Sequence, residues 1–214
     1  MEKIVIVGAG GFGREVKMLI DQINNANSTP LYEIEGFYDD AEGLPNLING
    51  IPLLGSLKNL SERNDLISVA LGVGIPKVKK EIALSLKNKN FRFPTLIHPN
   101  VYMGDEVNIG KGSIICANNI ITCNINMENF VTLNLSCTTG HDTFIGDFCS
   151  FMPSVNISGE VKIKESVYVG TGAKIINQLE IGENTTIGAG AVVAKSLPAN
   201  CTAVGIPAKP IKFH

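Results

Sequence analysis

The sequence predicts a chain of two parts, an α/β domain over residues 1–97 and a parallel β-solenoid with a C-terminal tail over residues 98–214. Three features predict this fold class. An apolar run leads into a glycine-rich turn near the N-terminus, apolar residues recur every six positions from Met103 to Val193, and three prolines interrupt the last part of the chain. The two parts therefore follow different periodicities, and we expect different backbone structures for them.

The N-terminal part combines strands and helices in the order of an incomplete Rossmann-like sheet. KIVIVGAGGFG is typical of a buried strand that ends in a glycine turn, and REVKMLIDQI has the apolar spacing of a helix. YEIEGFYDD and LISVALG indicate two more strands, KKEIALSLKN a second helix, and RFPTLIH a short last strand. This series is too short for a full dinucleotide-binding fold.

A glycine loop joins the first strand to the first helix. Gly8, Gly10 and Gly13 form the pattern G-x-G-x-x-G, which directs backbone N–H groups toward a phosphate at a helix N-terminus. Asp39 and Asp40 end the second strand, where a carboxylate would meet a ribose hydroxyl. Because a half-sheet cannot hold both halves of a dinucleotide, we expect a mononucleotide or a nucleotide sugar. NAD binding and a purely structural turn are the alternatives.

A six-residue period governs the second part of the chain. Fifteen of the sixteen positions counted by sixes from Met103 to Val193 are apolar, and no insertion interrupts the count. A helix would need apolar spacings of three and four, and a plain sheet would need alternation. A period of six instead indicates short strands that each send one large side chain inward, so that stacked coils supply the core. Pro198, Pro207 and Pro210 disfavour further regular coils.

Composition argues against several functions. A net charge of −2 and a pI near 5.9 give no electrostatic case for nucleic acid, and the charge run KVKKE at residues 77–81 is expected to be a solvated helix face. No apolar run approaches the ~20 residues that span a bilayer, so we expect no membrane insertion. Five cysteines without metal-type spacing predict reduced thiols in a cytoplasmic protein with no metal site, and Cys137 and Cys149 fall on core positions.

Repeats such as IGKGS, VGTGA and IGAGA resemble those of the hexapeptide-repeat acyltransferases. The resemblance implies a left-handed parallel β-helix in which three hexads form one triangular coil. Residues 18 apart then stack on neighbouring coils, and sixteen hexads give a little over five coils. The handedness follows from the resemblance alone, because other parallel crossovers are right-handed.

The hexad pattern breaks at one place, in LSCTTGHDTFIGDF, where Thr139 replaces the apolar residue and His141 and Asp142 follow. A carboxylate beside an imidazole favours the charged form, which suits a general base near pH 7. A solvated surface histidine is the alternative. With coils of 18 residues, Gly159 would lie one coil above His141, where its N–H is a candidate oxyanion donor. Base and donor would then face one spot.

From end to end, the chain is similar to the bacterial sugar acetyltransferases of the NeuD/PglD type. The motifs VGAGGFG, FYDD, GHDTFIGDF, SGEVKI, IGAGAVV and GIPAKPI carry this resemblance. It implies that His141 is the general base, that Asp142 tunes it and that Gly159 is the oxyanion donor. It also implies a homotrimer with its active sites at the subunit interfaces.

The same resemblance implies two binding surfaces. The nucleotide of a sugar substrate would contact Gly10, Gly11, Phe12, Asp39, Asp40 and Gly72. Acetyl-CoA would contact Ser150, Gly159, Thr171, Ala189 and Lys209, and a solvated tail lysine is the alternative at the last position. Phe12 and Ser150 stand where many relatives carry histidine, and Ser150 would replace one polar contact to acetyl-CoA.

The expected reaction transfers the acetyl group of acetyl-CoA to the 4-amino group of a UDP- or dTDP-linked 4-amino-4,6-dideoxy sugar, by direct attack with His141 as the base. Such a step belongs to glycan biosynthesis. O-acetylation of sialic acid or a related sugar, and a non-catalytic scaffold that binds nucleotide sugars, are the alternatives. A zinc enzyme of the γ-carbonic anhydrase type would need three histidines, whereas the repeat holds one.

Overall fold

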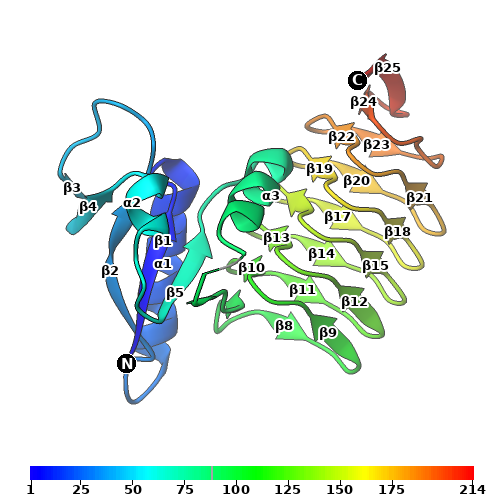
Figure 1. The fold of residues 1–214 in the computed structure, drawn as a ribbon. Coiled ribbons are helices and arrows are strands. Elements are labelled where there is room, and N and C mark those ends of the chain that lie inside the picture. The colour runs from blue at the N-terminus through cyan, green and yellow to red at the C-terminus, as the bar shows by residue number, and fades with distance from the viewer. Residues whose placement is uncertain (88) are drawn as a thin grey trace.

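The computed structural model describes residues 1–87 and 89–214 and shows two differently built parts (Figure 1). The elements of the N-terminal part are β1 (Glu2–Val7), α1 (Gly11–Ala26), β2 (Tyr32–Tyr38), β3 (Leu47–Ile48), β4 (Ile51–Gly55), α2 (Leu57–Ser61), β5 (Ile67–Leu71), α3 (Pro76–Ser85) and β6 (Phe91–Arg92). The strand order is β3-β4-β2-β1-β5-β6, and all neighbours except β3 and β4 run parallel. This is the predicted α/β sheet with additions at one edge.

The additions are a β-hairpin and a short helix that the sequence prediction omits. β3 and β4 pair antiparallel across Asn49 and Gly50, whose φ angles are 46° and 83°. Asn-Gly between apolar residues is a strong hairpin signal, so this element was readable from the sequence. α2 begins at a capping box between Ser56 and Asn59. The last residue of the predicted helix KKEIALSLKN, at position 88, lies outside the described residues.

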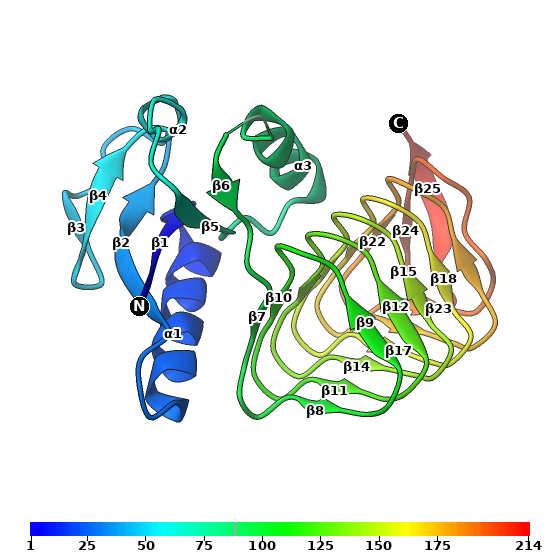
Figure 2. The ribbon, with the colours of Figure 1, turned by 60° about the horizontal axis from the view of Figure 1, so that its bottom comes forward.

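The second part is a solenoid of short strands that form three faces (Figure 2). The first face contains β7 (Leu96–Ile97), β10 (Ile114–Ile115), β13 (Thr132–Leu133), β16 (Ser150–Phe151), β19 (Tyr168–Val169), β22 (Thr186–Ile187), β24 (Cys201–Val204) and β25 (Lys209–Phe213). The second face contains β8 (Tyr102–Met103), β11 (Ile120–Ile121), β14 (Thr138–Thr139), β17 (Asn156–Ile157), β20 (Lys174–Ile175) and β23 (Val192–Val193). The third face contains β9 (Val107–Ile109), β12 (Ile125–Met127), β15 (Phe144–Ile145), β18 (Lys162–Ile163) and β21 (Glu180–Ile181).

Neighbouring laps of the solenoid pair at an offset of 18 residues up to β23, and the last lap pairs at 16, as between Thr186 and Thr202. Thr132, for example, lies between Ile114 on one lap and Ser150 on the next. The apolar hexad residues from Ile115 to Val193 point inward and form one continuous core, whereas Met103 at the start of the count is exposed. The strand register confirms the predicted lap length. Cys137 and Cys149 belong to this core, and burial raises the pKa values of their thiols to about 11 and about 12.

The stretch RFPTLIH divides between the two parts of the molecule. β6 ends the α/β sheet, and β7 begins the first face of the solenoid by pairing with β10. The first solenoid strand therefore lies just before residue 98. An apolar cluster joins α1 to this face and includes Phe12, Leu96, Ile114 and Cys116. The α/β domain and the outer side of the first face thus share one apolar cluster, which is separate from the core inside the solenoid.

Residues 77–81 do not form the fully solvated helix face that the charge run predicts. Lys79 on α3 is 1% exposed, and its Nζ donates to Thr132 Oγ1 and Ser150 Oγ at 2.9 Å each and to the Cys149 carbonyl at 3.2 Å. Three acceptors match the three hydrogens of an ammonium group. Burial away from any carboxylate lowers the pKa of Lys79 to about 7. A buried polar contact therefore fixes α3 to the first face.

The C-terminal tail ends the regular coils, as the prolines predict. β24 continues the first face by pairing parallel with β22, and β25 turns back antiparallel to β24. Ile206, Ile211 and Phe213 in this tail are exposed. Within the described part of the chain, no helix has both the length and the apolar character that a bilayer crossing requires.

Candidate active site

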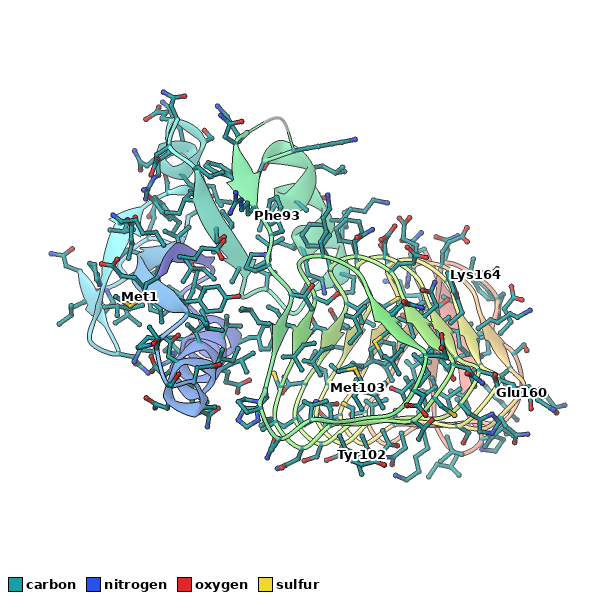
Figure 3. All side chains as sticks on the ribbon, turned by 90° about the horizontal axis from the view of Figure 1, so that it is seen from below. Met1, Phe93, Tyr102, Met103, Glu160 and Lys164 are labelled. Carbon is teal, nitrogen blue, oxygen red and sulfur yellow. The ribbon has the colours of Figure 1, made fainter. Side chains whose placement is uncertain are left out.

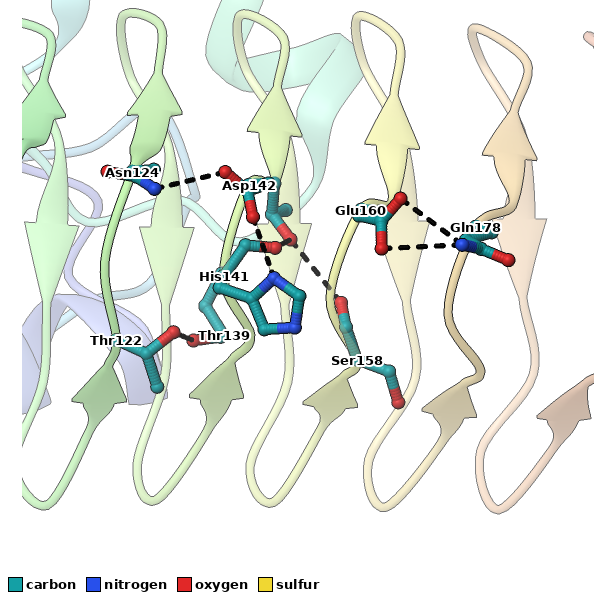
Figure 4. Close-up of polar contacts among 9 residues, drawn as sticks. Thr122, Asn124, Thr139, His141, Asp142, Ser158, Glu160 and Gln178 are labelled. Carbon is teal, nitrogen blue, oxygen red and sulfur yellow. Dashed lines mark hydrogen bonds and ion pairs between the residues drawn. The ribbon is translucent and has the colours of Figure 1, made fainter.

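The turn between β14 and β15 presents His141 and Asp142 at the edge between the second and third faces (Figure 4). The two side chains contact each other through Nδ1 and Oδ2 at 2.7 Å, and each is about half exposed. Asp142 has a φ of 57°, a left-handed conformation that aspartate tolerates better than most residues. We call the turns at this edge that hold or adjoin His141, residues 122–124, 140–143 and 158–160, the His141 edge.

Gly159 lies on the next lap after His141 and directly against its ring. A Cβ atom at Gly159 would come within 2.5 Å of His141 Nε2, so no side chain fits at this position without moving the imidazole. The next amide, that of Glu160, donates to the His141 carbonyl at 2.8 Å. Among the hydrogen bonds of the described residues, none uses the Gly159 N–H as a donor. Gly159 and the His141 imidazole are therefore neighbours one lap apart, and their roles as donor and base remain a prediction.

The protonation of this pair follows from its hydrogen bonds. The His141 ring bonds one oxygen of Asp142, and the Asn124 amide donates to the other oxygen at 3.1 Å. These two bonds hold the pKa of Asp142 below its usual range, and the bond to His141 has the larger effect. An ionised Asp142 accepts the hydrogen of Nδ1, which assigns the lone pair to Nε2. A basic nitrogen then faces Gly159.

Thr139 gives a physical meaning to the break in the hexad pattern. Its side chain is 1% exposed, and its Oγ1 has no hydrogen-bond partner in the described structure. A buried unpaired hydroxyl destabilises a protein by about 1–3 kcal/mol relative to a satisfied or apolar group. The strand that leads into His141 is thus packed less favourably than the apolar strands around it.

The residues expected to contact acetyl-CoA are distributed over different surfaces. Thr171 lies between β19 and β20, Ala189 lies between β22 and β23, and both are exposed. They stack one lap apart on the edge between the first and second faces, which we call the Thr171 edge (residues 152–155, 170–173 and 188–191). Lys209 begins the exposed strand β25. Ser150 is 0% exposed and bonded to Lys79, so the structure does not support its expected contact with acetyl-CoA.

The glycine loop leaves Gly10 and Gly11 exposed at the start of α1. Gly10 caps α1 without a side-chain bond, and neither Gly10 nor Gly11 has any atom within 4 Å of the place where a Cβ would stand. The N-terminus of α1 at these two glycines is thus uncovered, and a helix N-terminus is where an anion is expected to bind. Gly72 is buried instead, because its Cβ position is 2.6 Å from Gly13 Cα. Gly72 therefore supports the glycine loop from the inside of the domain. Phe12 is half-buried against the apolar cluster that joins α1 to the first face.

Asp39 and Asp40 hold backbone amides. Asp39 accepts from Ala9 in the glycine loop at 2.7 Å and from Ala41 at 2.8 Å. Asp40 accepts from the Leu57 amide at 2.8 Å. The two carboxylates therefore brace the loop and the start of α2, and a ribose hydroxyl would have to share them. This bracing role was not predicted.

The His141 edge and the α/β domain lie on opposite sides of the solenoid. Figure 3 shows Glu160, which follows Gly159 at the His141 edge, far from the α/β domain. The loop after β5 reaches the Thr171 edge, since the Cβ position of Gly74 is 3.7 Å from the Met152 side chain, and Gly72 in the same loop packs on Gly13 of the glycine loop. Within one chain, the His141 imidazole and the glycine loop are therefore far apart. In residues 1–87 and 89–214, no three His, Cys, Asp or Glu side chains are grouped to hold a metal ion.

Sequence reasoning missed two polar residues that the structure connects to these surfaces. Asn124 bonds Asp142 from the lap below, and the offset of 18 residues was a signal that could have found it. Lys79 had no comparable signal, because its acceptors lie 53 to 71 residues away on a sheet whose docking to α3 is not periodic.

Comparison with known proteins agrees with this architecture. The family model described as the PglD N-terminal domain matches residues 3–86, and the bacterial transferase hexapeptide model, with six repeats, matches residues 160–195. GDP-perosamine N-acetyltransferase of Escherichia coli O157:H7 is 32% identical over 97% of this chain and 95% of that protein.

Solved structures agree over the whole length. WeeI from Acinetobacter baumannii AYE is 33% identical with a TM-score of 0.86, covering 99% of this chain and 100% of its own. The acetyltransferase domain of PglB from Neisseria gonorrhoeae FA1090, in complex with acetyl coenzyme A, is 30% identical with a TM-score of 0.86 and covers 98% and 99%. The protein, an α/β domain followed by a left-handed parallel β-helix, therefore belongs to the hexapeptide-repeat sugar acetyltransferases of the NeuD/PglD type.

Proposed function

We propose that the protein transfers an acetyl group from acetyl-CoA to the amino group of a nucleotide-linked 4-amino-4,6-dideoxy sugar. The observation that carries this proposal is the position of His141 Nε2 over Gly159, with Asp142 behind the ring. Relatives named for sugar N-acetylation and a related structure in complex with acetyl coenzyme A support the choice of acceptor and donor.

The chemistry follows from the two groups at the His141 edge. The sugar amine attacks the thioester carbonyl, and Nε2 of His141 takes one proton from the nitrogen as the new C–N bond forms. The Gly159 N–H donates to the oxyanion of the tetrahedral intermediate. Cleavage of the C–S bond then releases coenzyme A, whose thiolate recovers the proton from the imidazolium ion.

Direct transfer is favoured over an acyl-enzyme formed on Cys137 or Cys149. Cys137 and Cys149 are buried, and burial raises the pKa values of their thiols to about 11 and about 12, which disfavours the thiolate that a covalent route needs. The five cysteines have no disulfide partners among the described residues, which supports the cytoplasmic location expected from the sequence.

A second copy of the chain completes the active site in this proposal. The glycine loop and the Thr171 edge lie on one side of the solenoid, and His141 lies at another edge. In a homotrimer, the His141 edge of one subunit would meet the Thr171 edge and the glycine loop of its neighbour. Acetyl-CoA would then lie between two solenoids, along Thr171 and Ala189 toward Lys209.

The nucleotide is the least specified part of the substrate. The sequence led us to expect UDP or dTDP, and the relative that acts on GDP-perosamine adds GDP to the panel. Gly10, Gly11 and Phe12, with Asp39, Asp40 and Gly72 around them, would contact this group. The alternative acceptor is a sugar hydroxyl, as in O-acetylation of sialic acid.

The test measures thiol release from acetyl-CoA with UDP-, dTDP- and GDP-linked 4-amino sugars and with sialic acid. We expect release with at least one amino sugar, loss of release by about 100-fold or more in His141→Ala, and normal release in His98→Ala. His98 is a suitable control because it lies in a turn of the first lap and bonds only the Asn100 amide through its ring. Release with sialic acid alone would favour O-acetylation, and release with none would favour a binding scaffold.

A further inference from the structure

We infer that Asn124 is a positioning residue for the His141–Asp142 pair, and this inference rests on the proposed function. Asn124 lies one lap below Asp142, and its Nδ2 donates to Asp142 Oδ1 at 3.1 Å while Oδ2 bonds the imidazole at 2.7 Å (Figure 4). The carboxylate is thereby held at both oxygens, with an amide on one side and the base on the other.

The turn that contains Asn124 supports the whole segment from Thr139 to Asp142. Thr122 donates to the Thr139 carbonyl from its amide and from its hydroxyl, both at 3.1 Å. The Asp142 amide donates to the Cys123 carbonyl at 3.1 Å. Of these bonds, only that of the Asn124 side chain reaches the Asp142 carboxylate, which contacts the imidazole. Backbone pairing sets the height of the turn, and Asn124 sets the direction of the carboxylate.

A second anchor is needed because the pair is exposed. The side chains of His141 and Asp142 are 56% and 51% exposed, and exposed ion pairs hold their geometry weakly. A carboxylate bonded at one oxygen can rotate, whereas bonds to both oxygens fix its plane. A fixed plane keeps the hydrogen on Nδ1 and leaves Nε2 as the acceptor above Gly159.

The neighbour on the other side cannot serve as this anchor. Glu160 occupies the same turn position one lap above Asp142, and its carboxylate is held by Gln178 Nε2 at 3.2 and 3.3 Å. From one lap to the next, this turn position therefore holds the amide of Asn124, the acids Asp142 and Glu160, and the amide of Gln178. Each acid is bonded by the amide on its outer side, but only Asp142 also contacts the histidine ring.

Asparagine suits both the backbone and the bond at position 124. Its φ of 55° is left-handed, a conformation that asparagine and glycine adopt more readily than other residues. Glycine would keep the turn and remove the donor. Aspartate would keep the shape and replace the donor by a second carboxylate against Asp142.

The experiment compares Asn124→Gly and Asn124→Asp with Gln178→Gly, which removes the matching amide from Glu160. We expect Asn124→Gly to lower kcat roughly three- to tenfold with an unchanged KM for acetyl-CoA, and Asn124→Asp to lower it further. Gln178→Gly should keep the kcat of the wild type. In an Asp142→Gly background, Asn124→Gly should change kcat by less than about twofold, because its route of action is gone.

A readout without turnover tests the same role. Imidazole ¹⁵N chemical shifts should show His141 in the Nδ1–H form in the wild type and in Gln178→Gly, with more of the Nε2–H form in Asn124→Gly. A wild-type kcat and tautomer in Asn124→Gly, or an equal loss of kcat with and without Asp142, would overturn the positioning role. Failure of the proposed function looks different, because wild type and His141→Ala would then release thiol equally.

Discussion

The His141 edge and the glycine loop, the two surfaces at which chemistry and recognition are proposed, are built by different rules. At the His141 edge, His141 meets Gly159 and Asp142 meets Asn124, and each pair is 18 residues apart. In the glycine loop, Ala9 depends on Asp39 and Gly13 depends on Gly72, across separations that no repeat fixes. The edge is exposed and the loop is braced from the core. Changes at the edge should therefore affect turnover without unfolding the protein, whereas changes under the loop should affect both.

The largest expected effect is that of Gly159→Ala. The added Cβ would lie 2.5 Å from His141 Nε2, and the half-exposed imidazole can move away at little cost in stability. We expect turnover to fall about 100-fold or more while the free energy of unfolding changes by less than about 1 kcal/mol.

Thiol release and urea denaturation measure these two quantities. Ser158→Ala, in the same turn, is the control, since its exposed hydroxyl makes no hydrogen bond in the described structure. Normal turnover in Gly159→Ala would contradict the assigned geometry.

Asp39→Ala should affect the loop in the opposite manner. The Ala9 amide would lose its acceptor, and we expect the free energy of unfolding to fall by about 1–3 kcal/mol and the KM for the nucleotide sugar to rise about tenfold, with kcat little changed. Steady-state kinetics and denaturation on one sample measure both. Asp21→Ala, which breaks the partly exposed Lys17–Asp21 pair within α1, should change neither. A lower kcat with normal KM would place Asp39 in the chemistry instead.

Lys79 adds a pH dependence to the contact between the two parts of the molecule. Its folded pKa of about 7 lies below the ordinary value of 10.5, so the unfolded chain binds more protons between these values. The penalty for a charged buried amine is complete below pH 7 and disappears above 10.5. Stability should therefore rise with pH in this window, by up to about 1.4 kcal/mol per pH unit.

The measurement is the free energy of unfolding of wild type minus that of Lys79→Met at pH 7, 8 and 9. Lys77→Met is the control, because Lys77 is exposed on the same helix. A wild-type curve parallel to that of Lys79→Met would show that the amine does not titrate in this range.

The smallest expected effect is a gain. Thr139→Val removes the buried unpaired hydroxyl at nearly constant volume, and we expect about 1 kcal/mol of added stability with normal turnover. Thr143→Val is the matched control and should destabilise, because that buried hydroxyl donates to the Ser158 carbonyl at 3.3 Å. If Thr139→Val lowered turnover instead, the hydroxyl would have a role in positioning His141.

What the sequence could predict follows the same division between the edge and the loop. The hexads fixed the lap length in advance, and with it the stacking of Gly159 on His141 and, had it been sought, of Asn124 on Asp142. Apolar spacing predicts the main strands and helices of the α/β domain. It does not predict the hairpin, which the Asn49-Gly50 pair indicates instead.

Contacts between the parts were not readable. Nothing in a helical period shows that Lys79 faces a sheet, and the burial of Ser150 follows only from that docking. In the sequence, Asp39 likewise looks like an unpaired acid, because nothing there shows that it accepts a hydrogen bond from the Ala9 amide of the glycine loop.

The offset of 18 residues that the laps up to β23 share makes the solenoid modular. Because each strand bonds only to the laps directly below and above it, coils can be added or removed beyond Gln178 without disturbing the turns that hold the imidazole. The number of coils in the solenoid can thus change independently of the residues at the His141 edge. A family built on this plan can lengthen or shorten its scaffold while one short turn keeps its chemistry.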